Sequence, residues 1–241
     1  MVTELIEFER VVQSMLSRQL TSAQRKAFAW YAEELMLWNA RFNLTAITER
    51  SAIEVRHFLD SLTCLLALGP APSGRVVDVG TGAGFPGLPL KILCPQLDLT
   101  LIEATRKKVD FCQHVVKNLG LHGVEVIHAR AEDLGHDVNY REQYDYALAR
   151  AVAPLRVLVE YLLPLLNAGG VAVAQKGETA PAEAHAAEEA LRLVGGHVER
   201  LIPLELPGVA ETRYLVVITK VAATPAKFPR KAGIPSKRPL G

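Results

Sequence analysis

The sequence predicts an α/β fold in which a mainly parallel β-sheet is preceded by a helical N-terminal extension. From residue 75 onward, short apolar runs alternate with helical patterns, which is typical of βαβ units. Residues 1–68 show helical patterns alone, and Gly69-Pro-Ala-Pro72 separates the two regions. We therefore expect a helical extension over 1–72, a sheet domain over 73–222 and a basic tail over 223–241.

The N-terminal region contains two predicted helices. Apolar residues recur at steps of three and four between Phe28 and Trp38, and Thr21 with Gln24 forms a capping-box pattern ahead of them. A second helix is expected over Ser51–Leu66. The helical spacing favours core packing over base stacking for the aromatic side chains of the first helix.

The sheet domain contains seven predicted strands with helices between most of them. The strands are expected at 75–79, 97–102, 124–128, 144–149, 170–175, 197–203 and 214–220. The helices are expected at 86–93, 107–119, 154–166 and 180–194. Residues 204–212 are too few for a crossover helix, so the last two strands should form an antiparallel hairpin at one edge.

Charge is distributed unevenly along the chain. The net charge is +1, but residues 220–241 contain six basic residues and no acidic one, so the remainder carries −5. A basic tail on a mildly acidic body favours contact with a polyanion, with a solubilising tail as the alternative.

Composition and pattern also narrow the class of protein. The three cysteines lie in apolar surroundings, which favours reduced thiols over disulfides or a zinc site. The N-terminus is acidic where a secretion signal would be basic, and no apolar run reaches the ~18 residues of a membrane span. We expect a cytoplasmic protein without a membrane anchor and, because no long apolar stripe stands out, a monomer.

A glycine-rich loop follows the first strand. Gly80, Gly82 and Gly84 lie between a buried strand and a helix, where glycine lets the backbone approach a ligand closely. Phe85 takes the place of the third glycine in a dinucleotide fingerprint. The loop therefore fits a nucleoside better than a pyrophosphate.

Acidic residues follow the next two strands. Glu103 ends the second strand, 23 positions after Gly80, where a carboxylate can accept both hydroxyls of a ribose. Glu132 follows the third strand and could accept an adenine amino group. Arg150, just past the fourth strand, belongs to the same edge of the sheet.

The chain carries further motifs that the glycine loop does not explain. They are Trp38-Asn-x-x-x-Asn43-Leu-Thr45, Arg56-His-x-x-Asp60-Ser, Glu103-Ala-x-x-Lys-Lys108, Arg130-Ala-Glu132, Arg150-Ala-Val-Ala-Pro154, Gln175-Lys-Gly177, Arg213 and Phe228-Pro-Arg-Lys-Ala-Gly233. Over nearly the whole chain they resemble the RsmG (GidB) family of bacterial methyltransferases, which modify N7 of a guanine in small-subunit ribosomal RNA.

The resemblance implies a class I fold dependent on S-adenosylmethionine (SAM), which is Rossmann-like with seven strands and an antiparallel edge hairpin. It implies SAM as cofactor and 16S ribosomal RNA or the small ribosomal subunit as partner. The cofactor contacts are expected at Gly80, Gly82, Gly84, Phe85, Glu103, Ala104, Thr105, Ala131, Glu132 and Arg150. Of these, Phe85, Thr105 and Arg150 rest mainly on the resemblance.

The implied chemistry needs no base. Guanine N7 carries a lone pair at neutral pH, so an in-line displacement can be driven by positioning, which is worth about 7–11 kcal/mol at best. We expect neither a metal nor a covalent intermediate.

The residues that could assist the chemical step are Arg150, Lys176 and Asp60. Arg150 could bind the SAM carboxylate, bind a phosphate or pair with a local acid such as Asp145. Lys176 could contact guanine O6, contact a phosphate or be solvated.

Asp60 could stabilise the charge that develops on the methylated base, and His57 on the same helical face is expected to pack. The RNA contacts are expected on a basic rim made of Arg106, Lys107, Lys108, Lys176, Arg213, Lys227, Arg230, Lys231, Lys237 and Arg238. Three alternatives remain open: a methyltransferase with another substrate, an NAD(P)-linked oxidoreductase, and a SAM-binding assembly factor without turnover.

Overall fold

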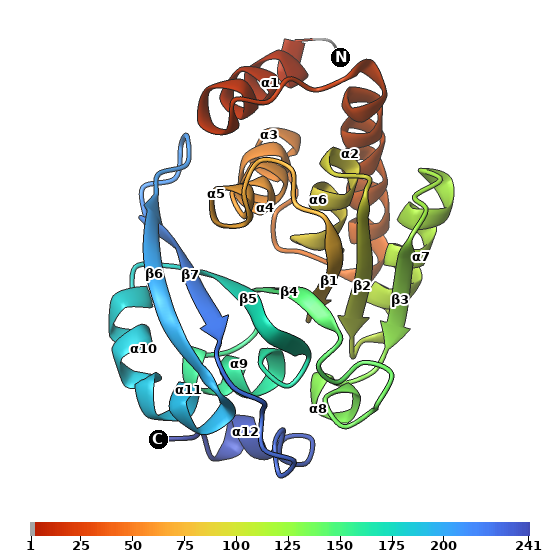
Figure 1. Ribbon diagram of the computed structural model, residues 1–241. Coiled ribbons are helices and arrows are strands. Elements are labelled where there is room, and N and C mark those ends of the chain that lie inside the picture. The colour runs from red at the N-terminus through yellow and green to blue at the C-terminus, as the bar shows by residue number, and fades with distance from the viewer. Residues whose placement is uncertain (1–2) are drawn as a thin grey trace.

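A seven-stranded β-sheet forms the centre of the computed structural model, which describes residues 3–241, with side chains from residue 7 onward (Figure 1). The strands are β1 (Gly74–Val79), β2 (Leu97–Glu103), β3 (Val124–His128), β4 (Tyr144–Arg150), β5 (Leu166–Lys176), β6 (Gly196–Leu204) and β7 (Arg213–Lys220). Their order is β3-β2-β1-β4-β5-β7-β6. The five strands β1 to β5 pair in parallel, and β7 is antiparallel to both β5 and β6. The predicted sheet and its antiparallel edge hairpin are confirmed.

Helices precede and cover the sheet. In the N-terminal region they are α1 (Thr3–Leu16), α2 (Ser22–Phe42), α3 (Arg50–Ile53), the π-helix η1 (Glu54–Leu59), α4 (Asp60–Leu62) and α5 (Leu65–Leu68). Between and after the strands they are α6 (Gly87–Leu93), α7 (Arg106–Asn118), α8 (Ala131–Leu134), α9 (Leu155–Leu162), α10 (Ala180–Ala186), α11 (Glu188–Val194) and α12 (Ile234–Lys237). None of the helices within 3–241 is long and apolar enough to cross a lipid bilayer.

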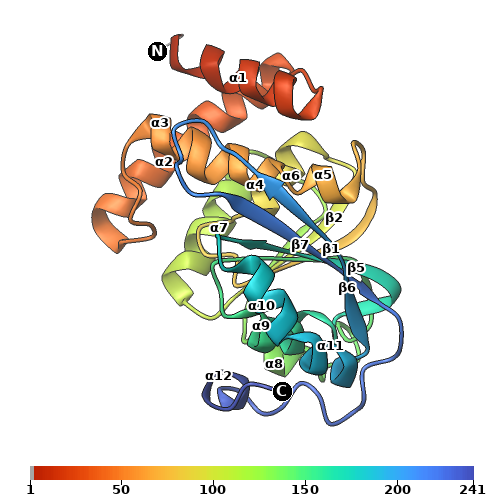
Figure 2. The ribbon, with the colours of Figure 1, turned by 90° about the vertical axis from the view of Figure 1, so that its left-hand side faces the viewer.

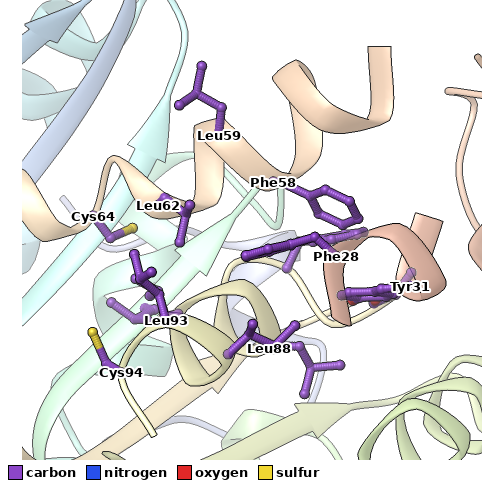
Figure 3. Packing of buried hydrophobic residues seen from close by; sticks show 14 of the residues in the cluster. Phe28, Tyr31, Phe58, Leu59, Leu62, Cys64, Leu88, Leu93 and Cys94 are labelled. Carbon is purple, nitrogen blue, oxygen red and sulfur yellow. The ribbon is translucent and has the colours of Figure 1, made fainter. Parts of the chain in front are cut away.

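The N-terminal helices share a hydrophobic core with one face of the sheet. Figure 3 shows Phe28 and Tyr31 of α2 and Phe58 of η1 close to Leu88 of α6. The rings of Phe28 and Phe58 lie 5.1 Å apart, and Tyr31 is fully buried. A second core, between α8 to α11 and the other face, completes the layered arrangement. Core packing is confirmed for Phe28 and Tyr31, which are fully buried, and Trp30 and Trp38 pack partly buried against the same core. The Thr21 capping box that begins this helix is also confirmed.

One predicted helix, Ser51–Leu66, is wrong as a continuous element. The structure divides it into α3, η1, α4 and α5, with a π-helical stretch from Glu54 to Leu59. Side chains bond to nearby backbone carbonyls here: Ser61 Oγ donates to His57 O at 2.5 Å, and Thr63 Oγ1 to Asp60 O at 2.5 Å. Such bonds compete with the regular helical pattern, and π-turns often accompany functional sites.

Two other helices are shorter than predicted. The helix expected over 154–166 ends at Leu162, because Pro164 cannot continue it and β5 already begins at Leu166. The helix expected over 180–194 is divided at Ala187 into α10 and α11.

The C-terminal tail folds back onto the sheet domain. Figures 1 and 2 show it near α9 and α11, with α12 at the opposite end of the molecule from α1. The guanidinium of Arg141 donates to the carbonyls of Thr224 and Phe228 at 2.6 and 2.8 Å. The tail is therefore an integral part of the folded domain.

Candidate active site

A pocket of about 230 Å³ opens at the carboxyl ends of β1, β2 and β3. It is lined by Val79, Gly80, Ile102, Glu103, Ala104, Ala129, Arg130, Ala131, Glu132, Val152, Ala153, Tyr161 and Ser236. Strand order reverses between β1 and β4, and ligands of open α/β sheets bind at such a switch point. Five of the predicted cofactor residues, Gly80, Glu103, Ala104, Ala131 and Glu132, meet here.

The glycine loop is held between two other segments. Gly80 has φ +68°, and a Cβ there would lie 2.8 Å from Cγ2 of Val152. Gly84 has φ +95°, and its Cβ would lie 2.5 Å from the hydroxyl of Tyr31, which donates to Ala83 O at 2.5 Å. Only glycine fits these two positions without displacement of a neighbour. Tyr31 thereby ties the N-terminal helices to the cofactor loop.

Glu103 is fixed at the end of β2. Its Oε2 accepts from the Gly82 N–H at 3.0 Å and its Oε1 from the Thr105 N–H at 2.7 Å, and the residue is 7% exposed. Each carboxylate oxygen has a second lone pair, so this side chain can still accept two hydroxyl groups.

Glu132 is the second carboxylate that lines the pocket. This buried residue of α8 accepts from the Gly233 N–H through Oε1 at 2.9 Å. Its Oε2 makes no hydrogen bond within residues 3–241 and stays available to a ligand. The two carboxylates therefore offer separate acceptors in one pocket, which fits a ribose joined to an aminopurine.

Asp78, fully buried in β1, supports the same loop. Its Oδ2 accepts from the Thr81 hydroxyl at 2.6 Å and from the Gly87 N–H at 2.8 Å. Its Oδ1 has no partner among the described residues. Burial raises the pKa of Asp78 to about 6. This carboxyl group fixes both ends of the glycine loop, a role that the sequence analysis missed.

Arg150 connects the end of β4 to the N-terminal helices. Its NH1 donates to Asp60 Oδ2 at 2.9 Å and to Arg56 O at 3.0 Å, and its guanidinium lies 5.0 Å from the ring centre of Phe85. The alternative partner considered from the sequence, Asp145, is wrong: that carboxylate accepts from the Arg75 N–H and from Asn167. Arg150 and Asp60 form a nearly buried ion pair.

His57 completes this cluster as a neutral group. Its ring stacks on Phe85 at 4.5 Å, Nδ1 lies 3.1 Å from Arg150 NH2, and Nε2 lies 2.8 Å from Thr45 Oγ1. Because a guanidinium can only donate, Nδ1 accepts and Nε2 carries the hydrogen. Burial, with the Arg150 charge as the second cause, lowers the pKa of His57 to about 3. The ring packs and orients Arg150, and no proton transfer at neutral pH is assigned to it.

Replacing His57 with glutamine is expected to reduce the loss of stability in acid. The folded-state pKa lies below the ordinary 6.5, so the unfolded chain binds the proton first and stability falls as the pH drops from 6.5 towards 3. Between pH 7 and pH 5 the wild type should lose up to about 2 kcal/mol more than His57→Gln. Urea unfolding at both pH values measures this, and equal losses would contradict the assignment.

Lys176 supports the loop after β4. Its Nζ donates to Ala153 O at 2.5 Å and pairs with Glu183 at 2.8 Å, and Glu183 also accepts from the Leu155 N–H. Ala151 in the same loop has φ +54°, a rarely occupied conformation for a residue with a side chain. These partners give Lys176 a part in shaping the pocket wall, and a contact with substrate stays a prediction.

The members of the predicted basic rim lie in different environments. Six are exposed: Arg106, Lys107, Lys227, Lys231, Lys237 and Arg238. Arg230 forms an ion pair with the fully buried Glu160 at 2.6 Å, and the partly buried Arg213 has a buried Nε without a partner in the described chain. The exposed six are the members that a phosphate can reach, and one of them, Arg106, also pairs with Asp110 at 2.8 Å.

Some pocket residues were not among the site residues predicted from the sequence. Tyr161 of α9 and Ser236 of α12 line the pocket, and their hydroxyls lie 3.0 Å apart. By contrast, the predicted contacts Gly82, Gly84, Phe85, Thr105 and Arg150 are not among the residues that line this pocket. Across 3–241, no three His, Cys, Asp or Glu side chains gather in a way that could hold a metal ion.

Comparisons with known proteins agree with this geometry. Residues 24–207 match the profile of the GidB family, described as rRNA small subunit methyltransferase G. The "Ribosomal RNA small subunit methyltransferase G" of Roseiflexus castenholzii is 53% identical over 222 residues, which covers 92% of this chain and 94% of that protein.

Solved structures share the fold at lower identity. TrmN from Thermus thermophilus has a TM-score of 0.52 at 20% identity, covering 70% of this chain and 53% of its own. M. jannaschii TYW2 in complex with AdoMet has a TM-score of 0.51 at 16% identity, covering 65% of this chain and 73% of its own.

Proposed function

The chain belongs to the GidB family of rRNA small subunit methyltransferases, and from that premise we propose that it transfers the SAM methyl group to N7 of a guanine in 16S ribosomal RNA. It is an enzyme, and SAM is its cofactor. The observation that carries the proposal is the single pocket that both Glu103 and Glu132 line. We further propose that it acts as a monomer in the cytoplasm on the RNA or the small subunit.

The residues of this chain bind and orient rather than move protons. Glu103 accepts the ribose hydroxyls, Glu132 accepts the adenine amino group, and Gly80 allows close approach of the backbone. When bound, SAM supplies an electrophilic methyl group. Guanine N7 needs no deprotonation, so catalysis follows from holding N7 in line with the methyl carbon. Asp60, Arg150 and His57 fix Phe85 and the loop beside the pocket and thereby help to set that alignment.

A single-turnover assay tests the proposal. Labelled SAM is incubated with small-subunit particles from cells lacking this enzyme, and the RNA is digested for nucleoside mass spectrometry. Label in N7-methylguanosine is expected. Label in another nucleoside would overturn the substrate, and tight SAM binding without transfer would favour an assembly factor. Calorimetry with NADH should give no binding, since Phe85 replaces the third glycine of a dinucleotide loop.

Removing exposed basic residues near α12 is expected to weaken RNA binding without loss of cofactor affinity. In a Lys231→Ala/Lys237→Ala/Arg238→Ala variant, the slope of log affinity against log salt should fall by about 0.7–0.9 for each phosphate that the protein no longer neutralises. The control is Arg10→Ala/Lys26→Ala, on α1 and α2, because α1 lies at the far end of the molecule (Figure 1). Equal slopes in the two variants would show that these basic residues of the tail do not contact RNA.

A further inference from the structure

The C-terminal segment from Pro229 to Arg238 reaches the cofactor pocket at Ser236. Ser236 lines the pocket and is exposed, so its hydroxyl can be reached by a ligand. That hydroxyl shares a hydrogen bond with Tyr161 at 3.0 Å, and the Gly233 N–H donates to Glu132 at 2.9 Å. Both contacts therefore join the segment to residues that line the pocket, Tyr161 and Glu132.

The segment is anchored before it reaches the pocket. Arg230 binds the fully buried Glu160 through Nε at 2.9 Å, NH2 at 2.6 Å and its backbone N–H at 2.7 Å. Pro229 packs against Gly135, where a Cβ would lie 2.6 Å from its ring, and Pro229 O lies 2.5 Å from His136 Nε2. The segment is therefore already ordered before a ligand binds, so binding loses little conformational entropy there.

The backbone at Gly233 determines how Glu132 is presented. Gly233 has φ +81°, a conformation that favours glycine, and this places its N–H on Oε1 of Glu132. The bond fixes the carboxylate rotamer and leaves Oε2 as the acceptor for a ligand. An ionised carboxylate can only accept, so in this position it selects a 6-amino purine over a 6-oxo purine.

We propose that this C-terminal segment completes the adenine end of the cofactor site, with Gly233 as a positioning residue for Glu132 and Ser236, beside Tyr161, as a binding residue. The inference rests on the proposed function, because it takes an S-adenosyl compound as the ligand. The C-terminal tail then has a role in cofactor recognition that is separate from any contact of its lysines with RNA.

The test compares S-adenosylhomocysteine and S-inosylhomocysteine by calorimetry. In the second ligand a carbonyl oxygen replaces the 6-amino group of the purine, and N1 carries a hydrogen. The intact chain should bind the adenosyl compound about 10-fold more tightly or better. A chain that ends at Lys231 keeps the Arg230 anchor and loses Gly233 and Ser236. It should bind S-adenosylhomocysteine about 10-fold more weakly and distinguish the two ligands by less than about 3-fold.

Ser236→Ala resolves the contribution of the hydroxyl. It should weaken S-adenosylhomocysteine binding by about 3- to 10-fold. Ile234→Ala, on the same segment but with an exposed side chain, is the matched control and should stay within about twofold of the intact chain.

The possible outcomes separate the two proposals. A general loss of stability would weaken both ligands equally and leave their ratio unchanged, which would overturn the role of Gly233. If the shortened chain fails to fold, wild-type affinity in Ser236→Ala/Tyr161→Phe overturns the inference. Failure of the intact chain to bind S-adenosylhomocysteine at all would overturn the proposed function itself.

Discussion

Replacing Glu103 with glutamine is expected to weaken binding of S-adenosylhomocysteine by about 100-fold. The glutamine side chain has one acceptor oxygen, whereas the carboxylate accepts from the Gly82 and Thr105 N–H groups with its two oxygens. The variant loses the charge that strengthens these bonds and those to the ribose hydroxyls, each worth about 1.5–3 kcal/mol. Calorimetry measures the dissociation constant directly.

The matched control is Asp98→Asn, at the amino end of the same strand β2, where the residue is exposed. It removes one negative charge from the strand but should leave the dissociation constant within about twofold of the wild type. An affinity loss for Glu103→Gln no larger than that of Asp98→Asn would show that Glu103 does not bind the ribose.

Replacing Arg150 with methionine is expected to lower the free energy of unfolding by about 3–5 kcal/mol, because it leaves the carboxylate of Asp60 buried without its partner. The side chain of Asp60 is 4% exposed and that of Arg150 is 13% exposed, so water cannot readily take the place of the guanidinium. Urea unfolding at pH 7 measures the change, and methyl transfer should decline with it.

An exposed ion pair of similar length provides the control. Arg106 and Asp110 lie 2.8 Å apart, close to the 2.9 Å between Arg150 and Asp60, but their side chains are 68% and 44% exposed. Arg106→Met should therefore cost less than about 1 kcal/mol. Adding Asp60→Asn to Arg150→Met removes the unpaired negative charge of Asp60 and should restore at least half of the lost free energy of unfolding. Equal costs for the two arginine variants would contradict the buried pair.

The parts of the fold that depend on local patterns were predictable from the sequence. Each strand from β1 to β7 overlaps its predicted range, because alternation of apolar runs and helical patterns is visible over a few residues. Glu103 and Glu132 were also predictable, since Glu103 ends β2 and Glu132 lies four positions after the end of β3, and the carboxyl ends of both strands face the pocket.

Contacts between distant parts of the chain were not predictable in this way. Tyr31 bonds to the glycine loop across 52 positions, Arg150 to Asp60 across 90, and Gly233 to Glu132 across 101. No spacing rule encodes such pairs. The π-helix was missed for a different reason: apolar residues at three- and four-residue steps do not distinguish an α-turn from a π-turn.

A crystal structure of the protein with S-adenosylhomocysteine tests the central claim most directly. The account predicts that the ligand fills the pocket at the ends of β1, β2 and β3, with its ribose hydroxyls on Glu103, its amino group on Glu132 and its purine edge near Ser236. A ligand bound elsewhere, such as the larger groove of about 670 Å³ beside α11 and β6, would contradict it.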